Sequence, residues 1–364
     1  MKADDIISVD YYKLEKIIGM KKILTIVIPT YNMQDYLRRC LDSLIVPEDQ
    51  MKHLEVLVVN DGSKDNSSAI AHEYQDKYPD TFRVIDKENG NYGSCVNRGL
   101  KEATGTYFRI LDADDWFDNE SLQVLINTLF NLHQTIDVVF TNYIQIYNKN
   151  KNIKAVDIPI PFDKLIIRQK FFPFKEKHLE GLLVMHCITV RTQKMKDMNY
   201  FQQEGISYTD TEFAFYSLLH ADYMLILDVN LYNYFLGREG QTMEPSSMIS
   251  KENDFYLISK RLAGQFLQLD DLNENEKCNL ILPLSNIVYY FLRINLVLMP
   301  LTNDSKNKLD TIIKLYYPIT KAYSTYFTKL NVCKLPIVYL YKITKLDLHG
   351  FYKFLIALQN KLCS

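Results

Sequence analysis

Short apolar runs alternate with amphipathic segments between residues 22 and 147. Uninterrupted apolar runs rich in Val, Ile and Leu are typical of strands that are buried on both faces. Apolar residues at helical spacing in the segments between these runs predict amphipathic helices. The strands are expected at 23–28, 54–59, 82–85, 106–111 and 136–147, and the helices at 33–44, 65–78, 92–103 and 119–132. This alternation predicts an α/β fold with a mostly parallel central sheet flanked by helices.

The pattern changes twice after this segment. It is less regular up to residue 247 and mostly helical from about residue 250. In the irregular part we expect strands at 182–190 and 223–228, a helix at 209–219 and a glycine-containing loop at 237–242. The predicted organisation is an N-terminal extension (1–21), a main domain (22–247, with halves at about 22–145 and 146–247) and a helical C-terminal region (248–364).

One apolar stretch, residues 278–299, approaches the ~20 residues that a helix needs to cross a bilayer. It also contains Pro283, Arg293 and Asn295, and a charged side chain such as that of Arg293 is costly in the middle of a membrane. These residues favour a helix that is buried in the protein or faces a membrane. A true membrane span is the alternative.

Composition limits the classes of function. The 364 residues include 42 Lys and Arg against 44 Asp and Glu, a formal net charge of −2, which argues against a polycationic nucleic-acid-binding protein. The six cysteines are well separated and form no CxxC pair, so reduced thiols in a cytoplasmic protein are expected. The first twenty residues do not have the pattern of a signal peptide.

The strongest candidate for chemistry is the acidic turn Asp112-Ala113-Asp114 at the end of a predicted strand. Side chains two residues apart on extended backbone point the same way, so both carboxylates can face one ligand. Hard oxygen ligands suit Mg²⁺ or Mn²⁺, with substrate phosphates completing the coordination. The alternative is a solvated turn in which Asp118 or Asn119 caps the next helix. A DxD motif alone does not distinguish a metal site from a solvated turn.

Three other polar segments also follow predicted strand ends. In a parallel sheet such ends meet at one edge, where ligands bind. Asp61 could accept a hydrogen bond from a base N–H such as uracil N3–H, or it could simply form an Asx turn. Pro29-Thr30-Tyr31-Asn32 offers an aromatic face, and Asn89-Gly90 opens a helix whose N-terminus favours phosphate. The chain has neither a GxGxxG dinucleotide fingerprint nor a Walker loop at these points.

Four blocks together resemble the donor-binding half of family 2 glycosyltransferases, which have the GT-A fold. They are VIPTYN (27–32), VVNDGSKDNS (58–67), ENGNYGSCVNRGL (88–100) and ILDADDWFDNESL (110–122), in the same order and strand context. The resemblance covers roughly residues 22–145. It implies a nucleotide-sugar donor, most often a UDP-sugar, and a divalent cation, Mn²⁺ or Mg²⁺.

The resemblance also assigns roles to residues. It implies that the nucleoside is bound by Pro29, Thr30, Tyr31, Asn32, Asp61 and Ser63. It implies that the nucleotide side is lined by Asn89, Gly90, Asn97 and Arg98, and that Asp112, Ala113 and Asp114 meet the sugar and the metal, with Asp112 and Asp114 as metal ligands.

The acceptor half of the family usually has a Glu-Asp pair at the start of a helix, with the Asp as base. Here Thr209 replaces the Glu, so Asp210 is the implied base and Glu212 its local rival. The ordinary alternative is a residue that stabilises the helix N-terminus. The glycine-containing loop at 237–242 stands where the family has a phosphate-contacting loop, so Arg238 could neutralise the pyrophosphate leaving group, and Gln241 and Thr242 could close over the donor. A solvated glycine loop is the alternative. His186 lies in an apolar segment, where a core histidine is more common than a metal ligand.

These expectations describe an inverting glycosyltransferase acting by direct displacement. Acceptors in such a family are often glycans or lipid-linked intermediates of bacterial cell-surface polysaccharides. The alternatives are a noncatalytic module that binds nucleotide sugars or glycans, and a nucleotidyltransferase. The last would need a glycine-rich basic loop after the first strand, and residues 29–32 do not form one.

The near-zero net charge hides an uneven distribution. Residues 306–364 contain ten lysines and two acids, a local net charge of 10 − 2 = +8, interleaved with aromatic residues. Basic and aromatic interleaving favours an anionic lipid surface, which would place the protein peripherally at the inner face of the cell membrane. A helical bundle with a lysine-rich solvated face is the alternative. The oligomeric state stays open.

Overall fold

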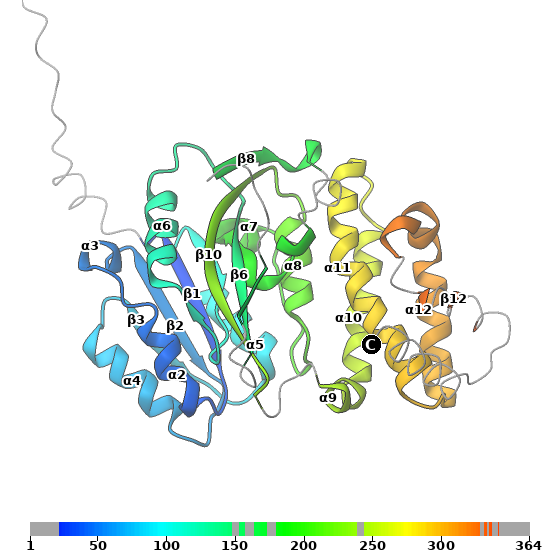
Figure 1. The fold of residues 1–364 in the computed structure, drawn as a ribbon, viewed down its shortest axis with the longest axis horizontal. Coiled ribbons are helices and arrows are strands. Elements are labelled where there is room, and N and C mark those ends of the chain that lie inside the picture. The colour runs from blue at the N-terminus through cyan, green and yellow to red at the C-terminus, as the bar shows by residue number, and fades with distance from the viewer. Residues whose placement is uncertain are drawn as a thin grey trace, which may run out of the picture.

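A computed structural model describes residues 22–147, 153–156, 164–172, 180–238, 244–327, 331–332, 335–336 and 341. Figure 1 shows a curved, twisted sheet with helices on both faces and a block of helices beyond one of them. In the part of the chain that the structure describes, ten strands join this sheet. They are β1 (Leu24–Thr30), β2 (Leu54–Asn60), β3 (Phe82–Asp86), β4 (Tyr107–Ile110), β5 (Trp116–Phe117), β6 (Val138–Tyr147), β7 (Ile153–Val156), β8 (Lys164–Arg168), β9 (Ile188–Arg191) and β10 (Tyr223–Leu236).

The sheet is parallel in its first half and mixed in its second. The main path runs β3-β2-β1-β4-β9-β6-β10-β5, with β7 beside β6 and β8 beside β10. Strands β1 to β4 pair in parallel, as do β6 and β10. β9 is antiparallel to both β4 and β6 and lies between them. The predicted mostly parallel sheet with flanking helices is confirmed. The strand expected at 182–190 is shorter, because its first part forms two 3₁₀ turns before β9.

The helices predicted up to residue 219 are present with boundaries that differ by one or two residues, and the structure adds the short helices α3 and α7. The main helices are α2 (Gln34–Asp42), α3 (Glu48–Met51), α4 (Ser67–Lys77), α5 (Asn91–Glu102), α6 (Asn119–Phe130), α7 (Thr192–Asp197), α8 (Asp210–Leu218), α9 (Pro245–Ser250), α10 (Glu252–Phe266), α11 (Glu274–Arg293) and α12 (Asn303–Ala322). Asp118 accepts a hydrogen bond from the Ser121 backbone N–H and so caps α6, as the sequence suggested.

Two hydrophobic cores lie on opposite faces of the sheet. The alternation along β1 separates them: Ile26 and Ile28 face the core under α2, α4 and α6, while Val27 faces the core under α5 and α8. α5 approaches β1 closely at Gly99, where an added Cβ would lie 2.5 Å from both Cγ atoms of Val27. A side chain at this position would therefore push α5 away from the sheet.

The C-terminal helices share the second of these cores. Buried side chains of α10, α11 and α12 are continuous with those of α5, α8 and the sheet. Figure 1 shows these helices stacked beside α8. The domain boundary expected at residue 247 falls within α9. The two regions are thus packed together, and the division between them remains a prediction.

The apolar stretch considered as a membrane span forms α11, which continues as a π-helical turn to Leu298. Residues 274–298 are long and apolar enough to cross a membrane by length and composition. In the structure 72% of the most apolar 18-residue segment of this helix is buried by the rest of the protein. Its buried face packs against α8 and α10, which favours the predicted core helix.

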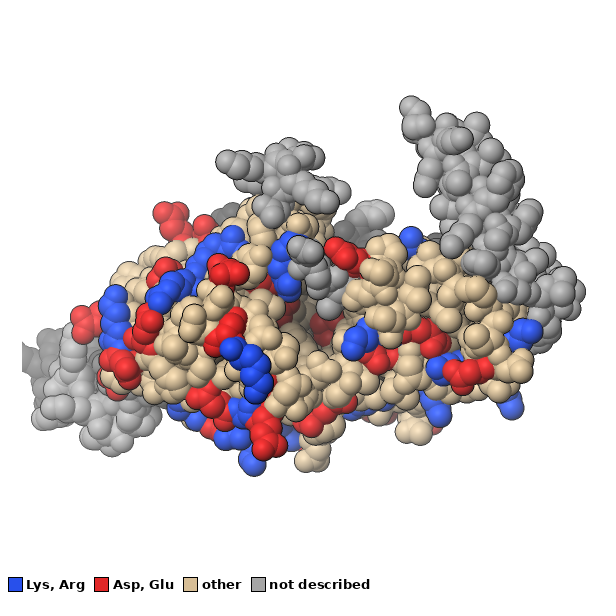
Figure 2. Space-filling view, turned by 90° about the horizontal axis from the view of Figure 1, so that it is seen from below, with Lys and Arg blue, Asp and Glu red and all other residues tan. Residues whose placement is uncertain are grey.

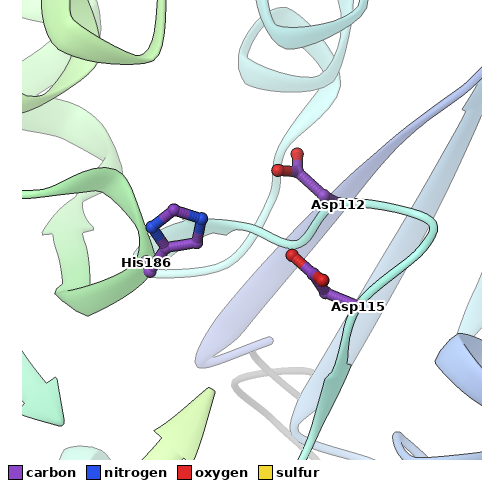
Figure 3. A group of neighbouring side chains, drawn as sticks. All are labelled: Asp112, Asp115 and His186. Atoms are coloured by element: carbon purple, nitrogen blue, oxygen red, sulfur yellow. The ribbon is translucent and has the colours of Figure 1, made fainter. Parts of the chain in front are cut away.

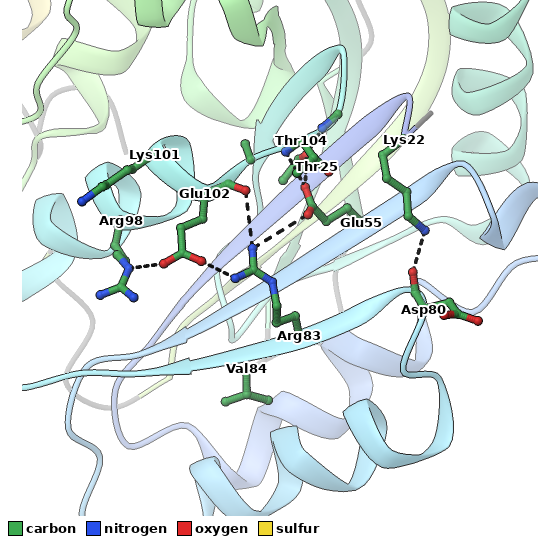
Figure 4. A network of polar contacts seen from close by, with 12 residues as sticks. Lys22, Thr25, Glu55, Asp80, Arg83, Val84, Arg98, Lys101, Glu102 and Thr104 are labelled. Carbon is green, nitrogen blue, oxygen red and sulfur yellow. Dashed lines mark hydrogen bonds and ion pairs between the residues drawn. The ribbon is translucent and has the colours of Figure 1, made fainter. Parts of the chain in front are cut away.

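Charged residues near the N-terminal ends of the parallel strands β1, β2 and β3 are paired with one another (Figure 4). The buried Glu55 carboxylate accepts hydrogen bonds from the Thr25 hydroxyl, at 2.6 Å, and from the Thr104 backbone N–H, at 2.8 Å. Arg83 and Arg98 both pair with Glu102. Figure 2 shows that basic and acidic side chains are interspersed over one face of the molecule, so their charges largely cancel there.

Candidate active site

The carboxyl ends of β1, β2 and β4 bring the predicted polar segments to one edge of the sheet. Thr30 ends β1, Asn60 ends β2, and the acidic turn begins two residues after β4. The Asp61 backbone N–H donates to the Thr30 carbonyl oxygen at 2.8 Å, so the first two segments are in direct contact. The convergence expected from the parallel topology is present.

A pocket of about 520 Å³ lies at this edge. Its walls come from the ends of β1, β2 and β3 and include three of the segments that the sequence singled out. Its lining residues are Tyr31, Asn60, Gly62, Lys64, Asp86, Lys87, Glu88 and Asn89. The Tyr31 ring is 46% exposed and offers a free aromatic surface at the rim.

The turn after β1 is fixed by hydrogen bonds to the turn after β2. The Asn32 backbone N–H donates to Ser63 Oγ at 3.0 Å, and the Lys64 backbone N–H donates to Asn32 Oδ1 at 2.8 Å. Asn32 has a φ of +53°, a conformation that asparagine tolerates better than most residues. The predicted nucleoside residues Asn32 and Ser63 thus shape the backbone beside the pocket.

Asp61 is buried and holds the start of α5. Its Oδ1 accepts from the Gly90 backbone N–H and its Oδ2 from the Asn91 backbone N–H, both at 2.9 Å. The Lys87 ammonium also pairs with Oδ1. The Asn89 side-chain amide donates to the Asp61 carbonyl oxygen at 2.9 Å. Asp61, Asn89 and Gly90 therefore meet, and the Asp61 carboxylate lies at the N-terminus of α5.

α5 also connects this edge to the later part of the chain. Gly93 lies against the segment before α8, where an added Cβ would be 2.0 Å from the Gln203 carbonyl oxygen. Asn97 exchanges hydrogen bonds of 2.8 Å with the Gln202 backbone, and the Gln202 side chain donates to Thr209 Oγ1 at 2.8 Å. Asn97 thus orients the start of α8. Arg98 does not reach the acidic turn: its guanidinium is exposed and pairs with Glu102 (Figure 4).

The acidic turn contains three carboxylates with different partners. Asp112 Oδ1 accepts from the Tyr92 hydroxyl at 2.7 Å. Asp114 pairs with Arg238, which joins two residues that the sequence analysis had assigned separately. Asp115 is fully buried and accepts from the Tyr232 hydroxyl and the Phe235 backbone N–H, each at 2.7 Å. Ala113 is buried between them, and Trp116 packs beneath the turn with the Arg39 guanidinium 3.8 Å from its ring centroid.

Burial and neighbouring negative charges raise the pKa of two of these carboxylates, Asp112 and Asp115. Burial, followed by the charge of Asp114, raises the pKa of Asp112 to about 7. Burial, followed by the charges of Asp114 and Asp112, raises the pKa of Asp115 well above its usual value. Two nearby carboxylates in a dehydrated turn cannot both ionise cheaply unless a cation accompanies them.

His186 is brought to the acidic turn from a distant part of the sequence (Figure 3). Ligand atoms of Asp112, Asp115 and His186 all lie within 4.8 Å of one another. Burial, with a smaller contribution from the Arg109 charge, lowers the pKa of His186 to about 3, so its imidazole is neutral. Sequence reasoning placed His186 in the core and missed this proximity, because no local spacing links it to the aspartates.

The residues present suit a divalent cation. Two carboxylates and a neutral imidazole are a donor set that accommodates Mn²⁺, and oxygen ligands alone suit Mg²⁺. Asp114, the second metal ligand expected from the sequence, is held by Arg238. Asp112 is common to the expected pair and to the group that the structure brings together.

Asp210 is the first residue of α8, as predicted. Its carboxylate is close enough to the acidic turn for the two to interact electrostatically. Burial raises the pKa of Asp210 to about 6, and hydrogen bonds from the backbone N–H groups of Thr211 and Asp210 partly oppose this. The charge of Asp210 is in turn among the causes that raise the pKa of Asp112. A carboxylate with a pKa near 6 is a stronger base than an ordinary aspartate.

Glu212, the rival to Asp210, has other partners. Its side chain is fully buried, pairs with Arg261 at 2.8 Å and accepts from the Gln203 backbone N–H at 2.9 Å. This carboxylate stabilises the contact between α8 and α10. Gln241, Thr242, the N-terminal extension 1–21 and most of the basic segment 306–364 lie outside the described residues.

Comparisons with known proteins agree with the layout of the site. Residues 25–197 match the model of the family described as glycosyl transferase family 2. An uncharacterized glycosyltransferase of Mycoplasma genitalium is 38% identical over 133 residues, 36% of this chain and 43% of that protein. The poly(ribitol-phosphate) beta-N-acetylglucosaminyltransferase TarS of Staphylococcus aureus is 27% identical over 280 residues, 74% of this chain and 45% of TarS. The chain thus spans under half the length of these curated relatives.

Solved structures agree on the fold. Residues 1–349 of S. aureus TarS in complex with UDP-GlcNAc superpose with a TM-score of 0.60 at 21% identity, covering 84% of this chain and 90% of that one. A mannosyltransferase of Pyrobaculum calidifontis in complex with GDP-Man and Mn²⁺ gives a TM-score of 0.50 at 13% identity, covering 92% and 94% of the two chains. These likenesses bear on the fold, which is the GT-A fold expected from the sequence.

Proposed function

We propose that the chain is a glycosyltransferase that moves a sugar from a nucleotide donor to an acceptor hydroxyl, because residues 25–197 match the model of glycosyl transferase family 2. The observation that carries the proposal is the position of Asp210. Its half-buried carboxylate, with a pKa of about 6, lies within electrostatic reach of the acidic turn at the carboxyl edge of the sheet. A base and a candidate metal-binding turn thus share one site.

We propose a UDP-sugar as the donor. The pocket of about 520 Å³ has room for a nucleoside, and the exposed Tyr31 ring offers a surface for stacking a base. We propose that Thr30, Asn32, Asp61 and Ser63, which lie in the turns beside the residues that line the pocket, position those residues for the nucleoside. TarS, whose structure was solved with UDP-GlcNAc, supports this choice of nucleotide.

The diphosphate is proposed to lie between the pocket and the acidic turn. Arg238 is proposed to bind it there, and in the structure its charge is neutralised by the ion pair with Asp114. An incoming diphosphate competes with Asp114 for the Arg238 guanidinium, because a guanidinium can form a bidentate pair with phosphate. Asp114, freed from Arg238, would hold the cation together with Asp112. A bound Mn²⁺ or Mg²⁺ supplies electrostatic stabilisation of the departing diphosphate.

Asp210 is the proposed catalytic base. It accepts the proton of the acceptor hydroxyl while that oxygen attacks the anomeric carbon and the bond to the nucleoside diphosphate breaks. Direct displacement of this kind inverts the anomeric configuration. A positioned base typically contributes ~10²–10⁴-fold.

The acceptor is proposed to be a glycan or a lipid-linked intermediate of a bacterial cell-envelope polysaccharide. The supporting observation is the relative that acts on poly(ribitol-phosphate). The proposed location is the cytoplasm, with the basic segment 306–364 at the inner face of the membrane.

A donor-hydrolysis assay tests the proposal. The protein is incubated with UDP-, GDP- and dTDP-sugars, with and without Mn²⁺, and nucleotide release is measured. We expect cation-dependent release of UDP from at least one UDP-sugar, at a much lower rate for Asp210→Asn. Cation-dependent binding of UDP without release from any sugar would favour the noncatalytic module instead.

A further inference from the structure

We propose that His186 supplies a nitrogen ligand to the divalent cation and forms, with Asp112 and Asp115, a three-residue centre that links the two halves of the domain. This inference rests on the proposed function, which places a cation at the acidic turn. What it adds is a ligand from the acceptor half, on the short 3₁₀ turn Met185–Cys187 before β9. No DxD motif contains or predicts this residue.

Geometry is the first argument. The ligand atoms of the three side chains lie within 4.8 Å of one another. Ligands on an octahedral cation with ~2.1 Å bonds are separated by about 3 Å when adjacent and about 4 Å when opposite, so the three side chains close on a cation by side-chain movements of up to about 2 Å. Figure 3 shows the imidazole and the two carboxylates directed toward a common space, with the histidine arriving from the opposite side.

The second argument is that the imidazole is held in place but has no hydrogen-bond partner. Among the described residues no side chain or backbone group makes a hydrogen bond to either His186 ring nitrogen. The ring is fixed by tyrosines instead: it stacks on Tyr143 with centroids 5.6 Å apart, and those of Tyr232 and Tyr234 lie at 4.7 and 4.5 Å. A half-buried polar ring without a polar partner is unusual, and a metal bond satisfies it.

The backbone of His186 is anchored as well. The fully buried Arg109, on β4, donates to the His186 carbonyl oxygen and, at 2.7 Å, to Thr189 Oγ1 on β9. β4 also leads directly into the acidic turn. One guanidinium therefore fixes the distance between the element that carries the aspartates and the turn that carries the histidine, as partners behind metal ligands commonly do.

Hydrogen bonds also fix the orientation of the Asp115 carboxylate. Tyr232 donates its hydroxyl hydrogen to Asp115 Oδ2 and accepts from the Asp112 backbone N–H at 3.2 Å. Each Asp115 oxygen accepts one hydrogen bond and keeps a lone pair available for a cation. A site with both nitrogen and oxygen donors favours Mn²⁺ over Mg²⁺ and Ca²⁺, which prefer oxygen alone.

Pulsed electron paramagnetic resonance tests the inference directly. The full chain is loaded with Mn²⁺ and UDP, and electron spin echo modulation is recorded. A directly bound imidazole produces ¹⁴N modulation, which we expect in the unmodified protein and expect to be replaced by a ¹⁵N pattern when only the histidines are ¹⁵N-labelled. This second measurement needs no substitution, so a misfolded variant cannot obscure it.

Variants then identify the histidine. His186→Asn is expected to lose the nitrogen modulation and to bind Mn²⁺ at least roughly tenfold more weakly, since even partners behind a ligand are worth 10–100-fold. The matched control His133→Asn, at an exposed histidine after α6, is expected to retain both properties.

The outcomes separate this inference from the proposed function. If calorimetry detects Mn²⁺-dependent UDP binding but no histidine modulation is observed, the His186 assignment is overturned and the glycosyltransferase proposal stands. If neither Mn²⁺ nor UDP binds, both are overturned.

Discussion

Replacing Asp210 by Asn is expected to abolish transfer and, at the same time, to stabilise the fold. The substitution keeps the shape of the side chain and removes its charge. As a base, Asp210 contributes ~10²–10⁴-fold, so the transfer rate should fall by that factor. Binding of the UDP-sugar should change little, because the nucleoside pocket and the acidic turn are left intact.

The gain in stability follows from the pKa. Burial raises the pKa of Asp210 from 3.8 to about 6, so the folded state disfavours the ionised carboxylate. The cost is absent below the unfolded pKa, develops as the pH rises to about 6 and is constant above it. At about 1.4 kcal/mol per pKa unit this amounts to roughly 3 kcal/mol. The lost attraction between the carboxylate and the α8 N-terminus is already contained in that net value.

Thermal unfolding across pH, together with UDP release and calorimetry, checks this reasoning. Asp210→Asn and the unmodified protein should unfold at similar temperatures near pH 4, and the variant should be the more stable at pH 7 and above. Normal turnover by the variant would remove Asp210 as the base. Loss of turnover accompanied by loss of stability at pH 7 would assign it a structural role instead.

Three further predictions concern the same site. The transfer rate of the unmodified protein should rise tenfold per pH unit up to about pH 6 and then level off, because Asp210 must be ionised to act as the base. A transfer rate that is independent of pH between 5 and 7 would contradict the role of Asp210. Glu212→Ala should lower the free energy of unfolding by ~3–5 kcal/mol in a denaturant titration, since it removes the fully buried side chain that pairs with Arg261 and accepts from the Gln203 backbone N–H; unchanged stability with lost activity would make Glu212 the base. Tyr92→Phe removes the donor to Asp112 and should weaken Mn²⁺-dependent UDP binding roughly tenfold by calorimetry, given ~1.5–3 kcal/mol for a hydrogen bond to a charged group; equal affinity would show that this bond does not orient Asp112.

Much of the donor half could be predicted from the sequence because its signals are local. The apolar runs of β1, β2 and β4 are buried on both faces, and their parallel pairing forces Thr30, Asp61 and Asp112 to one edge. Asp210 could be placed on the first turn of α8 for the same reason: a short polar segment precedes a helical pattern.

The remaining features depend on contacts between distant segments. β9 enters the sheet between β4 and β6, which carries His186 to the acidic turn. The pairing of Asp114 with Arg238 and the attachment of Asp61 to the start of α5 likewise join residues far apart in the chain. Periodicity and motif spacing describe neighbours along the sequence, so they contain no information on such contacts.

The central claim is that this site transfers sugar from a nucleotide donor, and UDP release measures it most directly. The unmodified protein and Asp210→Asn are each incubated with a panel of UDP-sugars and Mn²⁺. The account predicts that the unmodified protein releases UDP from a particular UDP-sugar, that chelating the cation stops the release, and that Asp210→Asn binds the same donor but releases UDP at least roughly a hundredfold more slowly. Equal release by the two proteins would contradict it.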